Sequence, residues 1–155
     1  DYGCPHCRDL FETLHELLES RKTKVKLTVL NFPLGNCHEA RGSCFVPRAA
    51  ECSFQQGGYA EFSDRAFELG AMSPVGQVEQ LPNILKDLGL EPVAFTACMD
   101  ADETMEKIKA DRRHGLDLGV TGTPTLFLNG RRVSNATSLE DLEKMVDKMA
   151  SEKAP

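Results

Sequence analysis

The sequence has no run of apolar residues that approaches the ~20 needed to span a bilayer. It also lacks a basic cluster: 24 acidic residues outnumber 18 lysines and arginines, which gives a net charge of −6. A nucleic-acid groove or an anionic membrane surface calls for the opposite charge, so neither partner is expected. Internal repeats, low-complexity tracts and obvious linkers are absent too. The 155 residues therefore predict one continuous domain over 1–155.

Cysteine is the most informative residue type that is present. Six cysteines occur, an even number, unevenly placed at positions 4, 7, 37, 44, 52 and 98. Even counts favour disulfides in an oxidising compartment, whereas cytosolic cysteines more often bind metals or perform redox catalysis. We therefore expect an extracytoplasmic protein.

The spacing of apolar residues predicts the elements at the two ends of the chain. Residues 5–20 place their leucines and phenylalanine on one helical face, and the alternation over 24–30 predicts a strand. A second strand is predicted over 125–128, and Asn129-Gly130 after it is the strongest local signal for a hairpin that returns over 131–134. Ser138 is placed to cap a last helix.

Between these ends, prolines and glycines divide the stretch of about 37–118 into helical pieces. The predicted helices lie near 46–56, 59–69, 75–88, 92–98 and 102–114. The order of elements is helix, strand, helical block, strand, strand, helix. This order predicts an α/β fold that carries a large helical insertion.

The candidate redox-active residues are Cys4-Pro5-His6-Cys7, at the start of the first predicted helix. The unpaired N–H groups and the positive end of a helix favour a thiolate at Cys4, and His6 adds to that stabilisation. Thiols in such settings have pKa values lowered to roughly 3.5–7.5. A stabilised thiolate leaves readily, so a Cys4–Cys7 disulfide would pass its oxidation on to another dithiol. Cys4 is then the attacking and attacked sulfur, and Cys7 the resolving one.

A Cys-x-x-Cys pair is also half of a zinc site. His6, His38, Cys37 and Cys44 could supply the remaining ligands. The second cysteine pair is separated by seven positions, however, and no second Cys-x-x-Cys follows. We therefore expect no metal, and we expect a redox centre in place of a zinc-binding module.

Three motifs together resemble the DsbA family of thioredoxin-fold thiol–disulfide oxidoreductases. They are Asp1-Tyr2-Gly3-Cys4-Pro5-His6-Cys7, Asn31-Phe32-Pro33-Leu34 and Gly119-Val120-Thr121-Gly122-Thr123-Pro124-Thr125. The resemblance covers nearly the whole chain, with the helical insertion of about 37–118 lying between the strand after the Cys-x-x-Cys helix and the proline strand. It implies that the Thr123–Pro124 peptide bond is cis and that these two residues bind an extended substrate beside the Cys4–Cys7 pair. Thr123 differs from the best-known oxidase and is similar to isomerase relatives.

The family fold places a central strand before the Cys-x-x-Cys helix. Only Asp1, Tyr2 and Gly3 precede Cys4, so that strand is missing from this sequence. The strands predicted over 24–30 and 125–128 would each lack their central partner and expose an edge. We expect the chain to be a fragment of a longer protein, or to receive the strand from elsewhere.

The other four cysteines read most simply as two structural disulfides. Four cysteines allow three pairings, and sequence does not choose among them. Our preference is one bridge within 37–52 and one that joins this segment to Cys98. Buried thiols and a second redox pair that passes electrons to Cys4–Cys7 are the alternatives.

The resemblance implies an enzyme that donates disulfides to reduced secreted proteins through Cys4, with Pro5 and His6 tuning the pair. It also implies reoxidation by a quinone-linked membrane partner of the DsbB or vitamin-K-epoxide-reductase type. No soluble cofactor is needed, because the cysteines carry the two electrons. The alternatives are a reductase or isomerase of the same fold, and a peptide-binding module with a vestigial redox centre.

Overall fold

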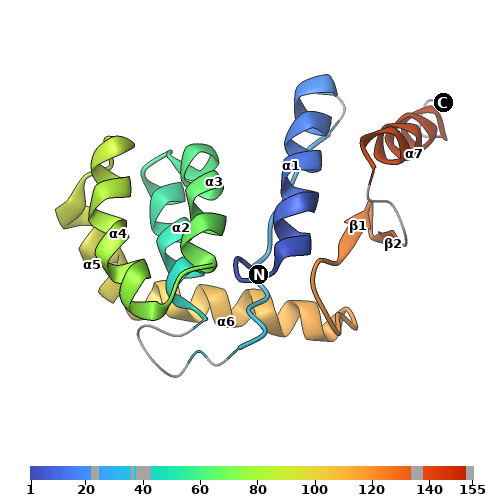
Figure 1. Cartoon of the computed structure of the whole chain (residues 1–155). Coiled ribbons are helices and arrows are strands. Elements are labelled where there is room, and N and C mark those ends of the chain that lie inside the picture. Colours follow the sequence, from blue (N-terminus) through green and yellow to red (C-terminus); the bar gives the residue numbers. More distant parts are fainter. Residues whose placement is uncertain (22–24, 36, 38–42, 134–137, 153–155) are drawn as a thin grey trace. The chain divides into compact units, whose positions relative to one another are not determined.

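The computed structural model describes residues 1–21, 25–35, 37, 43–133 and 138–152 (Figure 1). The elements, in chain order, are α1 Pro5–Ser20, α2 Phe45–Gln55, α3 Tyr59–Gly70, α4 Pro74–Asp87, α5 Pro92–Asp100, α6 Asp102–Asp117, β1 Leu126–Leu128, β2 Arg131–Val133 and α7 Leu139–Glu152. They form two compact units. The first unit comprises Asp1–Cys4 and Leu30–Thr123, and the second comprises Pro5–Val29 and Pro124–Pro155. The single domain expected over 1–155 stays a prediction.

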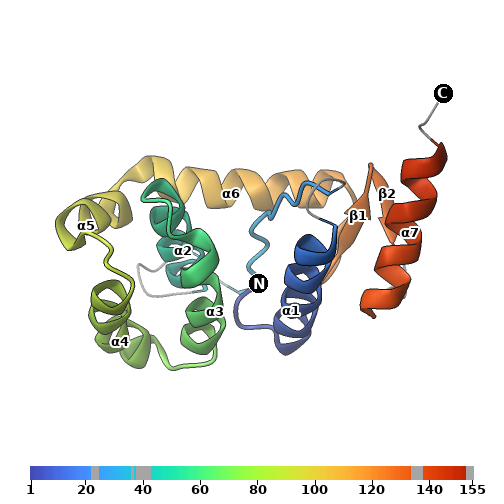
Figure 2. The same ribbon diagram turned by 90° about the horizontal axis from the view of Figure 1, so that it is seen from above.

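The first unit contains the predicted helical block as α2 to α6, with bounds close to those expected. Local capping explains where two of these helices begin. The Ser73 hydroxyl accepts a hydrogen bond from the Gly76 N–H at 3.3 Å at the start of α4. The Glu91 carboxylate accepts hydrogen bonds from Val93 and Ala94 at the start of α5. In Figures 1 and 2, α2 and α3 lie side by side and α6 crosses α2.

Large apolar side chains contributed by different helices fill the interior of this unit. Phe62 of α3 and Phe95 of α5 are almost fully buried, with ring centroids 6.2 Å apart. Leu69 of α3 and Ile108 of α6 are fully buried as well. Burial of such side chains contributes roughly 1.5–3 kcal/mol each. Apolar side chains of α3, α5 and α6 therefore form the interior of this unit.

The second unit contains the predicted hairpin. β1 and β2 pair antiparallel, with Leu126 opposite Val133 and Leu128 opposite Arg131. The turn residues Asn129 and Gly130 have φ angles of 49° and 79°. Two consecutive positive φ angles are those of a type I′ turn, whose twist matches the flanking strands. The hairpin signal in the sequence is thus confirmed over the described residues.

Helices α1 and α7 pack together in the second unit around Leu17, Leu142 and Val146. Partly buried residues of the helices, the hairpin and the segment after α1 surround them: Leu10, Leu14, Val25, Leu126, Leu128, Val133, Leu139 and Met145. The Ser138 hydroxyl accepts a hydrogen bond from the Asp141 N–H at 3.2 Å, which confirms the predicted cap of α7. Arg21 joins the two helices through ion pairs of 3.1 Å to Glu143 and Asp147.

The structure differs from the prediction over 24–30. Residues 25–30 carry no regular secondary structure, and Lys24 lies outside the described residues. The sheet of the described chain contains only β1 and β2. A strand exists only when a neighbour completes its backbone hydrogen bonds, and alternating side chains cannot supply that neighbour. The alternation was therefore insufficient to form a strand in this segment.

Candidate active site

The Cys-x-x-Cys motif lies at the start of α1, as predicted. Cys4 immediately precedes the helix, and Pro5 occupies its first position, where a backbone N–H is not required. Cys4 is half-buried, whereas Cys7, within the first turn, is only 9% exposed. A reachable thiol followed by a shielded one suits an attacking and a resolving cysteine.

Pro5 and His6 both face solvent at this helix start. The His6 side chain is 81% exposed, and its Nδ1 lies 4.0 Å from an Asp9 carboxylate oxygen. Asp9 was not among the residues singled out from the sequence. Its i,i+3 spacing from His6 is the signal that could have found it. His6 therefore carries a carboxylate neighbour within the first turn of α1.

The structure brings Cys4 to Thr123, which is 119 positions away in the sequence. The Cys4 thiol donates a hydrogen bond to the Thr123 carbonyl oxygen, with an Sγ–O distance of 3.6 Å. The Thr123 hydroxyl is shielded from solvent and has no hydrogen-bond partner among the described residues. Pro124 follows and is exposed. Two of the three motifs thus meet at the Cys4 sulfur, while the cis geometry of Thr123–Pro124 stays a prediction.

Tyr2 anchors the segment that carries Cys4 to α3. Its side chain is 8% exposed, its ring centroid lies 5.0 Å from that of Phe67, and its hydroxyl lies 3.4 Å from the hydroxyl of Tyr59. Burial and the neighbouring Tyr59 raise the pKa of Tyr2 well above its usual range, so the phenol stays neutral. The backbone of Tyr2 lies directly against Gly70, where a Cβ atom would overlap the Tyr2 carbonyl group.

Replacing Gly70 with alanine is expected to lower the free energy of unfolding by about 1–3 kcal/mol, because the added methyl group meets backbone atoms that cannot rotate away. Urea denaturation measures the change. Gly76→Ala in α4 is the matched control, since a Cβ there has no neighbour nearer than 3.4 Å and alanine favours the helix. Equal stability of the two variants would contradict the close packing of Tyr2 on Gly70.

The third motif, Asn31-Phe32-Pro33-Leu34, lies between Cys4 and α6. Its Leu34 N–H donates to the Asp1 carboxylate at 2.9 Å, and its Asn31 N–H donates to the Asp111 carboxylate at 3.2 Å. Asp1 belongs to the first motif quoted from the sequence, but no role was assigned to it there, and Asp111 was not singled out. Asp111 follows the helical pattern of 102–114 and carries no local signal, because its partner is 80 residues away. Only the fold brings these groups together.

The remaining four cysteines form two bridges in the first unit. Cys37 pairs with Cys44 at a Cα–Cα distance of 5.1 Å, and Cys52 of α2 pairs with Cys98 of α5 at 5.7 Å. This matches the arrangement that we preferred from the sequence. Bridged sulfurs are not available to zinc, so the alternative site loses Cys37 and Cys44 as ligands.

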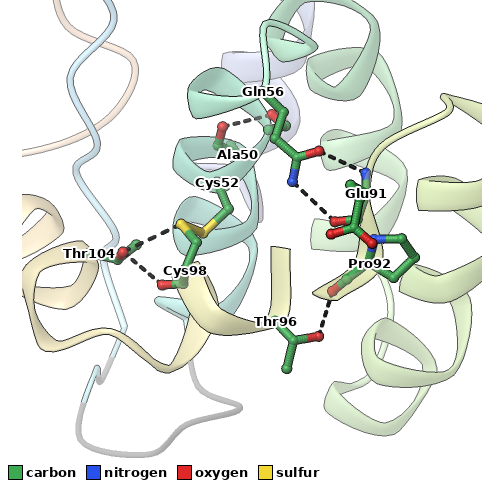
Figure 3. The surroundings of a disulfide bond; sticks show 9 residues. Ala50, Cys52, Gln56, Glu91, Pro92, Thr96, Cys98 and Thr104 are labelled. Atoms are coloured by element: carbon green, nitrogen blue, oxygen red, sulfur yellow. Dashed lines mark hydrogen bonds between the residues drawn. A yellow bond between two sulfur atoms is a disulfide. The ribbon is translucent and has the colours of Figure 1, made fainter. Parts of the chain in front are cut away.

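Figure 3 shows the polar contacts around the Cys52–Cys98 bridge. The Thr104 hydroxyl donates to the Cys98 carbonyl oxygen at 2.8 Å and lies 3.5 Å from the Cys98 sulfur. Nearby, the Gln56 amide makes two hydrogen bonds with the backbone of Glu91, of 2.7 and 3.2 Å. The bridge thus lies within a network that joins α2 to the start of α5 and to α6.

The described residues form neither a metal-binding cluster nor a membrane-spanning helix. Those residues contain no group of three or more His, Cys, Asp or Glu side chains placed to hold a metal ion. His38 lies outside the described part of the chain. Separately, none of the helices in the described ranges has the length and apolar character that crossing a membrane requires.

Two curated relatives resemble this chain over nearly all of its length. One, from Salinispora arenicola, is named Na(+)/H(+) antiporter NhaA 1 and is 29% identical over 94% of this chain, which covers 22% of that protein. The other, the Na(+)/H(+) antiporter NhaA of Herminiimonas arsenicoxydans, is 25% identical over 86% of this chain and 20% of its own length. The chain therefore spans about a fifth of the length of these relatives.

Several solved structures are similar to this chain over most of its length and most of their own. A thioredoxin-like oxidoreductase from Silicibacter pomeroyi is 27% identical, with a TM-score of 0.77 over 99% of this chain and 84% of its own. The thiol-disulfide exchange protein alpha-DsbA2 from Wolbachia pipientis is 28% identical, with a TM-score of 0.79 over 96% and 77%. DsbA from Pseudomonas aeruginosa, at 20% identity and a TM-score of 0.71 over 99% and 82%, supports the fold alone. The thioredoxin family model matches residues 1–148. The chain therefore belongs to the thioredoxin family and has the fold of its DsbA-like thiol–disulfide oxidoreductases.

Proposed function

We propose that this protein is a thiol–disulfide oxidoreductase that donates the Cys4–Cys7 disulfide to reduced extracytoplasmic proteins. The observation that carries the proposal is the half-buried Cys4 at the start of α1, with its sulfur 3.6 Å from the Thr123 carbonyl oxygen and the buried Cys7 three positions further on. A pair of this kind has one sulfur that a partner can reach and one that it cannot.

In the proposed reaction, a substrate thiolate attacks Cys4 Sγ of the oxidised pair. The Cys4–Cys7 bond breaks, Cys7 leaves as a thiolate, and a mixed disulfide joins the substrate to Cys4. A second substrate thiolate then attacks the substrate sulfur of that bond, and Cys4 leaves. The substrate loses two electrons and the Cys4–Cys7 pair gains them. We propose that Thr123 and Pro124 hold the extended substrate backbone, and that Pro5 and His6 tune the leaving tendency of Cys4.

The reduced pair must lose its two electrons before another cycle. We propose a membrane quinone-linked reoxidase of the DsbB or vitamin-K-epoxide-reductase type as the acceptor. Two further bridges, Cys37–Cys44 and Cys52–Cys98, support an oxidising compartment such as the periplasm or cell envelope. A reductase or isomerase of the same fold is the second candidate, which the threonine before Pro124 favours.

Single-turnover transfer tests the proposal. The oxidised 155-residue chain is mixed with a reduced peptide that contains two cysteines, and both partners are quenched by alkylation and counted by mass spectrometry. The proposal predicts one peptide disulfide formed for each Cys4–Cys7 disulfide lost, with the other two bridges intact. A peptide that stays reduced, or electrons that enter Cys52–Cys98 instead, would reject it.

A further inference from the structure

Asp1 holds the backbone that carries the reactive cysteine. One oxygen of its carboxylate accepts a hydrogen bond from the Gly3 N–H at 2.8 Å, and the other accepts one from the Leu34 N–H at 2.9 Å. The Asp1 carbonyl oxygen accepts a third bond from the Cys4 N–H at 3.1 Å. A single residue therefore fixes the turn that leads into Cys4 and attaches this turn to the 31–34 segment.

The 31–34 segment is itself held firmly by α6. The buried Asp111 carboxylate, 5% exposed, accepts hydrogen bonds from the Asn31 N–H and the Asn31 side-chain amide at 3.2 and 3.3 Å. The Arg112 side chain donates to the Pro33 carbonyl oxygen at 3.3 Å. Its guanidinium also lies 5.7 Å from the centroid of the Phe32 ring. Leu34, to which Asp1 is bonded, thus ends a segment with several contacts to one helix.

Thr123, whose carbonyl oxygen accepts the hydrogen bond from the Cys4 thiol, lies in the segment that follows α6. After α6 ends at Asp117, the chain passes through the buried Val120 to Thr123, whose carbonyl oxygen accepts the bond from Cys4 Sγ. The backbone of Cys4 is therefore connected to α6 by hydrogen bonds through Asp1 and Leu34. The sulfur of Cys4 is connected to α6 through its hydrogen bond to Thr123, which follows that helix. The two connections together define where the sulfur lies.

We propose that Asp1 is a positioning residue for the Cys4 sulfur, and that it acts by accepting the Gly3 and Leu34 N–H groups at once. The proposal rests on the proposed disulfide transfer by Cys4. Thiol–disulfide exchange requires the attacking sulfur to approach along the breaking bond, and a displacement of about 1 Å can cost up to 100-fold in rate. Without the carboxylate, the turn at residues 1–4 samples positions in which this alignment is lost.

A purely electrostatic role of Asp1 predicts the opposite result. A carboxylate near Cys4 disfavours the departing thiolate, so removal of its charge would leave transfer unchanged or accelerate it. The positioning role predicts slower transfer. The two roles also differ for asparagine, which keeps one acceptor oxygen and can satisfy one of the two N–H groups, but carries no charge.

The test compares Asp1→Ala, Asp1→Asn and the control Asp64→Ala, which removes an exposed carboxylate from α3. Each oxidised 155-residue variant transfers its disulfide to a reduced dithiol peptide over a range of peptide concentrations, and urea denaturation reports stability. We expect Asp1→Ala to lower the saturating transfer rate about tenfold with little change in the half-saturating concentration. We expect Asp1→Asn to lie between it and the wild type, and Asp64→Ala to match the wild type.

Three outcomes would overturn the positioning role: wild-type rates for both Asp1 variants, faster transfer, or an equal loss in the alanine and asparagine variants. A fall in the transfer rate that is matched by a fall in the urea midpoint would indicate a global loss of folding. That result would also overturn the positioning role. Failure of the wild type to transfer its disulfide would reject the proposed function, and this result does not depend on any Asp1 variant.

Discussion

Replacing Cys4 with serine is expected to lower the rate of disulfide transfer on the order of 1000-fold or more. A serine hydroxyl cannot form a disulfide with Cys7 or with a substrate, so neither half of the exchange can occur. The structure indicates why Cys4 is the residue to replace, because its sulfur can be reached by a substrate whereas Cys7 is 9% exposed. Single-turnover transfer to a reduced dithiol peptide measures the change.

Cys7→Ser is the matched control for Cys4→Ser. Its Cys4 thiolate can still attack a disulfide-bonded peptide, but no second thiol resolves the product. A mixed disulfide through Cys4 is therefore expected to accumulate, and peptide mass spectrometry identifies it. A Cys4→Ser protein that kept the full function of the wild type would contradict this account and favour a peptide-binding module.

Removal of the Cys52–Cys98 bridge is expected to lower the free energy of unfolding by about 4 kcal/mol. The bridge spans 46 positions, and its loss releases a long loop in the unfolded chain. Its loss also removes the covalent link between α2 and α5 at a site where Cys52 is fully buried. The double variant Cys52→Ala/Cys98→Ala avoids an unmatched thiol, and urea denaturation measures the difference.

The Cys37–Cys44 bridge supplies the matched comparison. It spans only 7 positions, so the same chain-entropy relation gives a loss of about 2 kcal/mol for Cys37→Ala/Cys44→Ala. The expected order of stability is wild type, then the 37–44 double variant, then the 52–98 double variant. The reverse order would show that loop length does not govern what these two bridges contribute.

The helices could be predicted because their signals are local. Ser138 caps the helix that follows it, and Asn129-Gly130 forms the turn between β1 and β2 with two positive φ angles. The strand expected over 24–30 failed for the opposite reason. Its alternating side chains are a local property, but a strand requires a hydrogen-bonded neighbour, and the described residues provide none.

The residues of the candidate site also differ in whether a local sequence signal could predict them. Cys4-Pro5-His6-Cys7 is a contiguous motif, and its position at the start of α1 followed from the sequence. The contact of Cys4 with Thr123 was expected only through family resemblance, because 119 residues separate the two. The Asp1–Leu34 and Asn31–Asp111 hydrogen bonds had no signal at all, since each depends on how distant segments are folded against each other.

The reduction potential of the Cys4–Cys7 pair tests the central claim most directly. The 155-residue chain is equilibrated in graded glutathione buffers, its thiols are alkylated, and each cysteine is counted by peptide mass spectrometry. An oxidase predicts that Cys4 and Cys7 become reduced in mildly reducing mixtures, well above the potential of about −270 mV typical of thioredoxin. A pair that stays oxidised down to strongly reducing mixtures would contradict disulfide donation and identify a reductase or a redox-inert protein.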